Sequence, residues 1–405
     1  MIERLKEDMI NLGEIGKQET GGISRPSFSD YDIEARKYVL KRFKEAGLMI
    51  HTDAAGNIIG IRPGKVESPI VTTGSHIDSV WNGGMFDGTL GVISGLEAIR
   101  MLNDSNIKTD LPIALIVFTD EEGAFSSLTG SSYFAGLLKK EELYELKNKY
   151  DGKKFKEGFE KIPKEGYVER FEKPIKSHVE LHIEQGPVLE SNNKDIGIVT
   201  GIVGVRWLKI TFIGKQSHAG ATPMNMRRDP VIPLAKTALK IRETALSYKE
   251  MVGTAGYIKV FPNVVNVIAG EATITADIRT LDLTDLENAV QKILRSAKMY
   301  AQNEKVGFNY SILQNKDPVI CSQSVMQAIK QSTEELGYSY ILLPSRAGHD
   351  TQNVAKITKD VGMIFVPSKG GISHSPDEWT EWEQAHKGVE VLKNVLIRLA
   401  SNIKS

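Results

Sequence analysis

The chain has 405 residues, and its 51 basic and 51 acidic residues give a formal net charge of +0. This balance argues against a nucleic-acid-binding or membrane-surface protein, because both need a large basic excess. The single cysteine, Cys321, excludes a disulfide framework and a cysteine-rich metal site, so any metal must be held by His, Asp and Glu. The length predicts two domains.

The N-terminal sequence "MIERLKEDMINLGEIG" is charged throughout and lacks the apolar region of a signal peptide. No apolar run approaches the ~20 residues that a membrane-spanning helix needs. We therefore expect a cytoplasmic enzyme or binding protein.

Strands and helices alternate along the first part of the chain. A helix is expected over residues 31–47, capped by Ser29 or Asp30 and ended by Gly47. Continuous apolar strands at 68–76 and 111–120 flank a helix at 88–102, which indicates a mainly parallel sheet covered on both faces. The mixed-charge stretch 139–176 is expected to be surface helix and loop.

The strand "SHVELHIEQG" at 177–186 alternates, with His178, Glu180, His182 and Glu184 on one face. Residues 205–315 differ in character, because half-exposed strands and two amphipathic helices predict a small inserted α+β domain. The remaining residues, 1–204 and 316–405, would form the larger domain. Its last helix is expected to start at Thr380, with Glu383 completing a capping box.

Several potential ligands follow predicted strands, and ligand-binding residues gather at the carboxyl ends of strands in open α/β sheets. His76, the pair Glu121–Glu122 and His374 each follow an apolar run, and Asp87 follows a glycine pair. Each alone is more simply a turn residue, a helix first turn or a solvated strand face. Together they form a nitrogen and oxygen set suited to zinc or manganese. In "HID", Asp78 could orient His76 and fix its tautomer. One glutamate could bind metal while its neighbour acts as a general base.

Seven motifs support a more specific assignment: "GSHIDSVWNGGMFDG", "FTDEEG", "ELHIEQGPVLE", "GKQSHAGATPM", "NVVNVIAGEATITADIR", "SRAGHDT" and "GISHSPDEW". Together they resemble the amidase (hydantoinase/carbamoylase) group of the dinuclear-metal M20 peptidase family, over nearly the whole chain. The resemblance implies an α/β catalytic domain with a central mixed sheet flanked by helices, plus a smaller inserted α+β lid through which two subunits pair.

The resemblance also implies residue roles. Asp87 would bridge two divalent ions (Zn²⁺ or Mn²⁺, with Co²⁺ or Ni²⁺ as alternatives), and Glu121 would be the general base. The metal ligands implied are His76, Asp87 and His182 at one ion, and Asp87, Glu122 and His374 at the other. The substrate-binding residues implied are Gln185, His218, Asn266, Arg279 and Gly348, and His218 would reach the partner subunit's active site.

Two departures from the family pattern concern positive charge. The family often has a basic residue where this chain has Met85, and an Arg after the "EEG" motif, where this chain reads "EEGAFSS". These losses are expected to affect substrate choice.

The predicted activity is hydrolysis of an N-carbamoyl-L-amino acid to the amino acid, CO₂ and ammonia. Allantoate hydrolysis is the nearest alternative, followed by an aminoacylase or dipeptidase activity. A catalytically idle binding protein on this fold is the alternative from another class. For Arg279, an ion pair with Asp277 or Glu271 is the structural alternative to carboxylate binding.

Overall fold

The computed structural model describes residues 2–401, and the chain divides into two compact units. Unit 1 comprises residues 1–200 and 321–405, and unit 2 comprises residues 201–320. The boundaries predicted from the sequence lie after residue 204 and after residue 315. Among the described residues, no helix is both long and apolar enough to cross a membrane.

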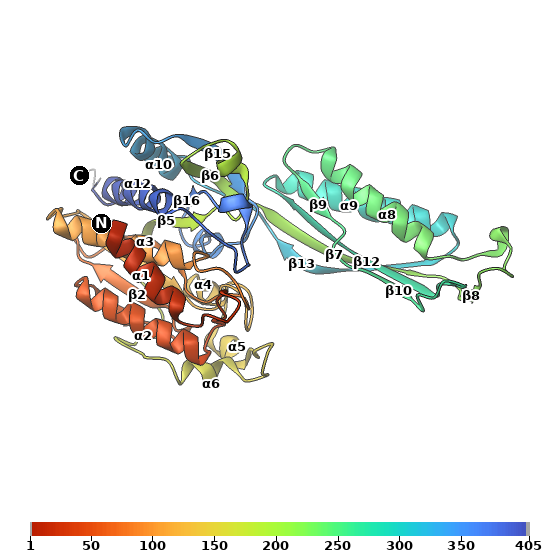
Figure 1. Cartoon of the computed structure of the whole chain (residues 1–405), viewed down its shortest axis with the longest axis horizontal. Helices are drawn as coiled ribbons and strands as arrows, with labels where there is room; N and C mark the ends of the chain where they lie inside the picture. Colours follow the sequence, from red (N-terminus) through yellow and green to blue (C-terminus); the bar gives the residue numbers. More distant parts are fainter. Residues whose placement is uncertain (1, 402–405) are drawn as a thin grey trace. The chain divides into compact units, whose positions relative to one another are not determined.

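Unit 1 is built on a nine-stranded mixed sheet with the order β1-β2-β4-β3-β5-β16-β6-β14, and β15 pairs with β6 (Figure 1). The four central strands β4, β3, β5 and β16 are parallel, and β2 and β6 join them antiparallel. The strands are β1 (Met49–Thr52), β2 (Ile58–Arg62), β3 (Ile70–His76), β4 (Ile113–Phe118), β5 (Ile175–Ile183), β6 (Ile196–Ile202), β14 (Val319–Ile320), β15 (Tyr340–Ser345) and β16 (Val361–Val366).

Helices cover both faces of this sheet, as the continuous apolar strands predict. Helices α3 and α12 pack together and against β3, β5 and β16, whereas α4 and α11 pack on β4, β5 and β16 (Figure 1). The helices are α1 (Ile2–Glu14), α2 (Asp30–Glu45), α3 (Thr89–Asp104), α4 (Thr129–Phe134), α5 (Lys140–Glu145), α6 (Phe155–Phe159), α7 (Val188–Ser191), α10 (Gln323–Glu335), α11 (Thr351–Val354), the 3₁₀ turn η2 (Lys369–Gly371) and α12 (Trp382–Ala400).

The predicted helix ends differ in outcome. Ser29 caps α2, since its side chain accepts a hydrogen bond from the backbone N–H of Asp32 at 3.2 Å. The expected start of the last helix at Thr380 is wrong. Helix α12 begins at Trp382 after Glu381, no side-chain cap is formed, and the Thr380 side chain is buried. The capping box therefore does not exist, because Thr380 lies one residue before the position that could cap this helix.

The stretch 139–176 is only partly the surface segment that its charge predicts. Phe155 and Phe159 of α6 are buried in an apolar cluster with Phe28 and Tyr133. The lysines and glutamates around them are mostly exposed. The segment therefore carries a small core of its own beneath a charged surface.

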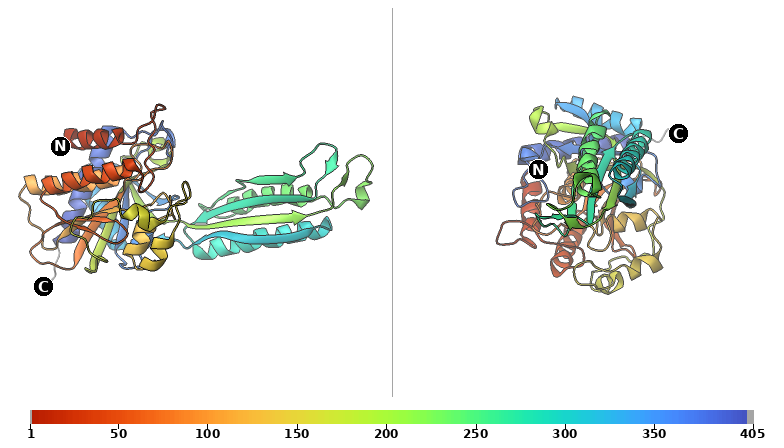
Figure 2. Two further views of the ribbon diagram at one scale, coloured as in Figure 1. Left: turned by 90° about the horizontal axis from the view of Figure 1, so that it is seen from below. Right: turned by 90° about the vertical axis from the view of Figure 1, so that its right-hand side faces the viewer.

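Unit 2 is a five-stranded antiparallel sheet, β10-β12-β7-β13 with β9 on β12, together with a two-stranded ribbon of β8 and β11. Helices α8 and α9 cover one face of the larger sheet (Figure 2). The elements are β7 (Gly204–Ile213), β8 (Ser217–His218), the 3₁₀ turn η1 (Met224–Met226), α8 (Val231–Leu246), β9 (Val252–Thr254), β10 (Ile258–Phe261), β11 (Val267–Ile268), β12 (Glu271–Thr280), α9 (Leu283–Asn303) and β13 (Gly307–Lys316).

Candidate metal centre

The carboxyl ends of the four parallel strands carry most of the predicted ligands. His76 is the last residue of β3, and His182 lies near the end of β5. Glu121 and Glu122 follow β4, and His374 follows β16. Because parallel strands end at the same edge of a sheet, residues far apart in the sequence meet there.

Asp87 lies at the middle of this group. Its Oδ1 is 3.2 Å from His182 Nε2 and 3.8 Å from His76 Nε2. Its Oδ2 is 3.0 Å from His374 Nε2, which lies 3.5 Å from Glu122 Oε1. The two carboxylate oxygens therefore face two donor sets, His76–Asp87–His182 and Asp87–Glu122–His374, and the donor atoms of each set lie within 4.8 Å of one another.

Gly88 allows the backbone to turn back against the imidazoles. Its φ is 63°, in the left-handed region that glycine adopts readily, and a Cβ there would lie 2.3 Å from His76 Nε2. Its N–H donates to His182 Nε2 at 3.1 Å. A larger residue would occupy the space between the two histidines and Asp87.

Backbone carbonyls orient the two buried histidines. His76 Nδ1 bonds the carbonyl of Asp78 at 3.0 Å, and His182 Nδ1 bonds the carbonyl of Ile183 at 2.9 Å. Each ring therefore directs Nε2 towards Asp87. Fixing one ring nitrogen in this way sets which nitrogen is available to a ligand.

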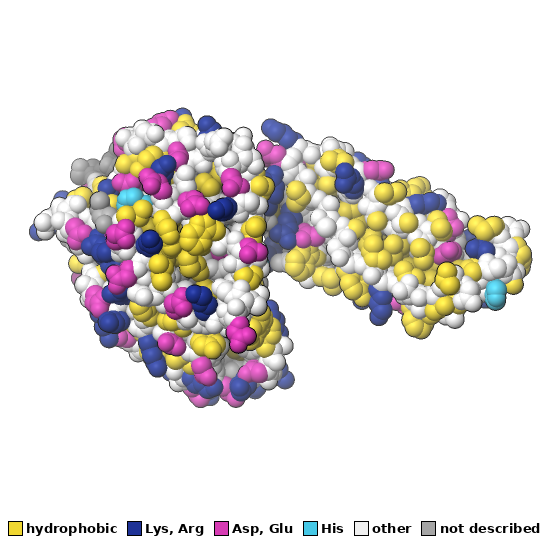
Figure 3. All heavy atoms as spheres, viewed as in Figure 1, with side chains coloured by type: hydrophobic (Ala, Val, Ile, Leu, Met, Phe, Trp, Pro, Cys, Tyr) yellow, Lys and Arg dark blue, Asp and Glu magenta, His cyan; other side chains and the backbone are white. Residues whose placement is uncertain are grey.

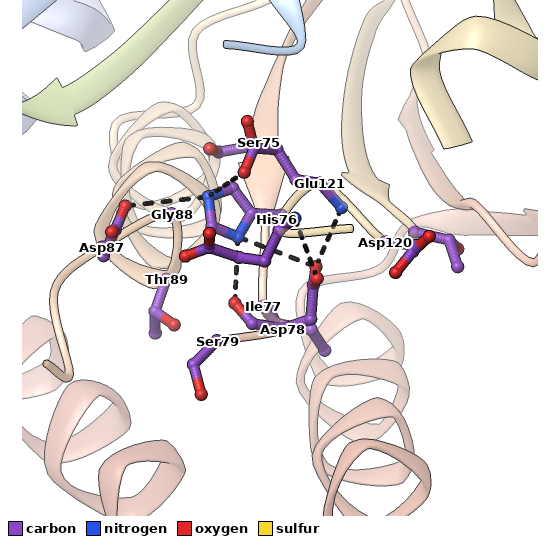
Figure 4. A network of polar contacts seen from close by, with 12 residues as sticks. Ser75, His76, Ile77, Asp78, Ser79, Asp87, Gly88, Thr89, Asp120 and Glu121 are labelled. Carbon is purple, nitrogen blue, oxygen red and sulfur yellow. Dashed lines mark hydrogen bonds and ion pairs between the residues drawn. The ribbon is translucent and has the colours of Figure 1, made fainter. Parts of the chain in front are cut away.

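Asp78 contacts His76 through its main-chain carbonyl and also through its carboxylate, the group expected to orient the ring. That carboxylate lies 3.7 Å from His76 Nδ1 (Figure 4). It also accepts the backbone N–H groups of Glu121 at 3.3 Å and Glu122 at 3.2 Å. Asp78 therefore ties the end of β3 to the turn that carries both glutamates.

Asp120 holds the other side of this turn. Its buried carboxylate accepts the N–H groups of Ala124 at 2.6 Å and Ser126 at 3.1 Å, and the Thr129 hydroxyl at 2.7 Å. Its own φ is 59°. The glutamate turn is therefore fixed by carboxylates at both ends.

The charges of the site are concentrated and shielded from water. Burial is the main cause that raises the pKa of Glu121 and of Glu122 well above the usual value. The charge of Glu122 adds to this effect on Glu121, and the charge of Asp87 adds to it on Glu122. Burial also acts on Asp87, but hydrogen bonds from His182 and His374 outweigh it and hold its pKa well below the usual range. The ion pairs of these carboxylates are with imidazoles. Buried anions need compensating charge, which a divalent cation would supply in place of the imidazole protons.

The pKa values of the three histidines also differ, according to burial and to contact with Asp87. Burial lowers the pKa of His76 to about 4. Burial also opposes protonation of His182, but its contact with Asp87 raises the pKa to about 9. The hydrogen bond to Asp87 is the main reason that the pKa of His374 rises to about 9.

Of the predicted substrate-binding residues, two lie in unit 1 beside this group. Gln185 donates from Nε2 to Asp87 Oδ2 at 3.1 Å, and its backbone is left-handed with a φ of 58°. Gly348 precedes His349, whose ring centroid lies 4.6 Å from that of His182 in an edge-to-face contact.

The other three lie in unit 2. His218 and Asn266 are neighbours in the β8–β11 ribbon, where the Ala219 N–H donates to the Asn266 carbonyl at 3.0 Å. Arg279 on β12 forms an ion pair with Asp277 at 2.8 Å. This ion pair is one of the structural alternatives to carboxylate binding by Arg279.

Two further buried groups around the ligands, Glu378 and His349, had no predicted role, and Glu180 was predicted only to lie on the polar face of its strand. Glu378 accepts the N–H groups of Phe86 and Asp87, and Glu180 accepts the hydroxyls of Ser75 and Thr351. His349 packs on His182 and bonds Ser345 Oγ at 2.9 Å. The only available signal was position, since Glu378 and His349 stand in the motifs "SHSPDE" and "AGHDT".

The resemblance implies missing cations at Met85, which lines a pocket together with Lys6, Glu14 and Lys17, and in the residues after Gly123, which include Phe125. The sulfur of Met85 lies 3.1 Å from where a Cβ on Gly13 of α1 would stand. Phe125 makes edge-to-face contacts with Phe28 and Phe155.

Comparison with known proteins identifies the family. The profile described as Peptidase family M20/M25/M40 matches residues 72–398. The chain is 40% identical over 405 residues to an N-carbamoyl-L-amino acid amidohydrolase of Geobacillus stearothermophilus, with 98% of each chain covered. The chain belongs to the M20 peptidase family.

Within that family it is a hydantoinase/carbamoylase amidase, an amidohydrolase that acts on C–N bonds. A solved amidase of this group from Burkholderia multivorans has a TM-score of 0.95 and 34% identity, covering 99% of this chain and 98% of that one. An allantoate amidohydrolase of Escherichia coli (strain K12) is 31% identical over 407 residues, with 98% of both chains covered. The predicted family and the predicted α/β fold are confirmed.

Proposed function

We propose that this amidase hydrolyses the linear C–N bond of a ureido acid, with an N-carbamoyl-L-amino acid as the preferred substrate class. The observation that carries the proposal is the position of Asp87 between two donor sets beside a glutamate pair. The similarity to an N-carbamoyl-L-amino acid amidohydrolase supports the substrate class.

The residues present fit two divalent cations. His76, Asp87 and His182 would hold one, and Asp87, Glu122 and His374 would hold the other. Imidazole and carboxylate donors suit Zn²⁺ or Mn²⁺ and also accept Co²⁺ or Ni²⁺. When bound, such cations make water more acidic and polarise a carbonyl.

Glu121 is the general base of the proposed reaction. Its Oε2 lies 3.7 Å from His76 Nε2, beside both donor sets, and its pKa is raised above the usual value chiefly by burial. Glu121 takes a proton from the water that adds to the ureido carbon, and it delivers that proton to the amino-acid nitrogen as the C–N bond breaks. The carbamic acid released gives ammonia and CO₂.

The remaining roles follow the family resemblance. Arg279 would bind the α-carboxylate, because its planar fork matches two carboxylate oxygens. Gln185, Asn266 and Gly348 would contact the substrate, and His218 would stabilise the oxyanion that forms at the attacked carbon.

Pairing of two subunits through unit 2 stays a prediction of the resemblance. Exposed apolar side chains on unit 2, including Phe261, Val265 and Tyr310, support it (Figure 3). The molar mass in solution, measured by light scattering, tests it: a monomer at micromolar concentration would exclude it.

The first prediction concerns metal content. Asp87→Ala removes a donor from both sets and should leave almost no bound metal, whereas His374→Ala should leave about one ion per chain instead of about two. Elemental analysis after dialysis against Zn²⁺ or Mn²⁺ measures this. His51→Ala is the control, because His51 belongs to neither donor set and its ring bonds the Gly166 carbonyl at 3.3 Å. Equal metal in Asp87→Ala and wild type would contradict the assignment.

The second prediction concerns the base. Glu121→Gln keeps the side-chain size but cannot take a proton, so kcat should fall by roughly 10²–10⁴. Metal content should remain that of the wild type. A variant that turns over at close to the normal rate would remove Glu121 from this role.

The third prediction concerns the carboxylate anchor. Arg279→Ala should raise KM for a carboxylate-bearing substrate by roughly tenfold or more, because a charge-assisted bidentate contact is lost. It should change KM for the corresponding amide far less. Because Arg279 also pairs with Asp277, Asp277→Ala is the control for simple loss of that ion pair. An equal effect of Arg279→Ala on both substrates would assign Arg279 a structural role only.

The fourth prediction separates the candidate activities. An ammonia-release assay with several N-carbamoyl-L-amino acids, allantoate and β-ureidopropionate, run with each metal, should give the highest kcat/KM for an N-carbamoyl-L-amino acid. Highest activity on allantoate would select the nearest alternative. Release of amino acids from N-acyl amino acids or dipeptides alone would indicate an aminoacylase or dipeptidase. If the metal-loaded protein turned over none of these compounds, the remaining alternative would be a catalytically idle binding protein on this fold.

A further inference from the structure

The Glu378 carboxylate connects two loops that belong to different parts of the sequence. Its Oε1 accepts the backbone N–H of Phe86 at 2.9 Å and that of Asp87 at 3.0 Å. Its Oε2 accepts the hydroxyl of Ser373 at 2.8 Å. One side chain therefore fixes both the residue that faces two donor sets and the neighbour of His374.

Ser373 extends this connection to the ligand itself. Its Oγ lies 3.4 Å from Asp87 Oδ2, the oxygen that faces His374. Glu378 thus accepts a hydrogen bond from the backbone N–H of Asp87, and Ser373 links Glu378 to the side chain of Asp87. Both ends of the same aspartate are held by one buried carboxylate.

Gly84 provides the space that Glu378 occupies. A Cβ on Gly84 would lie 2.0 Å from Glu378 Oε1 and 2.4 Å from Glu378 Cβ. The backbone of Gly84 is not in the left-handed region, so the requirement for glycine is one of space and not of φ. The second glycine of "NGGMFDG" is therefore matched to the glutamate of "SHSPDE".

Aromatic packing holds the same two loops together. The Phe86 ring lies 5.4 Å from Trp379 and 5.4 Å from Trp382, and Phe86 is fully buried. Contacts of this kind are non-directional compared with hydrogen bonds, so they bring the loops together without setting the orientation of Asp87. Glu378 is the side chain that holds the backbone N–H of Asp87, whereas Gln185 and Ser373 contact its carboxylate.

We propose that Glu378 is a positioning residue that orients Asp87 and the His374 loop for cation binding, and that Gly84 is glycine in order to admit it. The inference rests on the metal centre of the proposed function. Groups that orient metal ligands contribute about 10- to 100-fold to metal affinity in other proteins. Glu378 donates nothing to the cation; it acts through Asp87 and Ser373.

The direct test is the dissociation constant for Zn²⁺ and for Mn²⁺, measured by competition with a chromophoric chelator. Glu378→Ala removes the acceptor for two buried N–H groups and should weaken metal binding by roughly 10- to 100-fold. Glu378→Gln keeps an acceptor for both N–H groups and an amide that can bond Ser373, so it should restore affinity to within about threefold. Binding is measured below the unfolding transition of each variant.

Glu97→Ala is the matched control, since Glu97 is also a fully buried carboxylate but pairs with Arg4 and Arg100. It should lower the unfolding temperature and leave metal affinity unchanged. Equal metal affinity in Glu378→Ala, Glu97→Ala and wild type would overturn the proposal, whatever happens to stability.

A double-mutant cycle tests the match with Gly84. Gly84→Ala should displace Glu378 and weaken metal binding about as much as Glu378→Ala does. In a Glu378→Gly background, which also removes the Cβ that would lie 2.4 Å from the added methyl, the methyl has room, so the double variant should bind metal no more weakly than Glu378→Gly alone. Additive losses would show that Gly84 acts independently and would overturn that part.

The outcomes also separate this inference from the proposed function. Weakened metal binding in Glu378→Ala, with no hydrolysis of any ureido acid by the wild type, would refute the function and support the positioning role. Hydrolysis of a ureido acid by the wild type, with unchanged metal affinity in Glu378→Ala, would support the proposed function and refute the positioning role. A wild-type chain that binds neither metal would refute both.

Discussion

Burial of several carboxylates at one edge of the sheet is the constraint from which the rest of the site follows. An ionised carboxylate is costly to bury without hydrogen bonds or a counter-charge. Asp78 and Asp120 are stabilised by backbone N–H groups, and Asp87 by imidazoles. Burial nevertheless raises the pKa of Asp78 and of Asp120 to about 7. Burial, with the charge of Glu122 acting on Glu121 and that of Asp87 acting on Glu122, raises the pKa of both glutamates well above the usual value. The cluster is therefore short of positive charge at the place where the donor atoms converge.

The same constraint explains how the backbone is used. Donors must reach the carboxylates from several loops at once, and two glycines leave the necessary space. Gly88 lies against the imidazole of His76, and Gly84 lies against Glu378. In the polar turn after β3, the imidazole and the carboxylate therefore occupy the space that side chains at these two glycine positions would otherwise fill. Its composition reflects the close approach of ligands and the groups that hold them.

The positions that could be predicted from the sequence are those that follow a strong local pattern. His76, Glu122, His182 and His374 were found because each lies on or after an apolar strand, and parallel strands share an edge. The cap at Ser29 has an equally local signal. The second role of the Asp78 carboxylate could not be predicted, because its hydrogen-bond donors are backbone N–H groups of a turn more than forty residues away, as the separations of 43 and 44 show. Backbone donors leave no pattern in side-chain types, and for the same reason Glu378 passed unnoticed.

The donor set alone does not determine substrate selectivity. Divalent cations held by such a donor set would activate water and a carbonyl for any linear C–N bond brought to them, so they would not select the group beyond that bond. Selection must come from residues that contact the rest of the substrate. Met85 lies beside α1, and Phe125 packs in an apolar cluster. The resemblance implies that positive charge is missing at Met85 and after Gly123, and such a change would alter the field felt by an anionic substrate without replacing any of the predicted metal ligands.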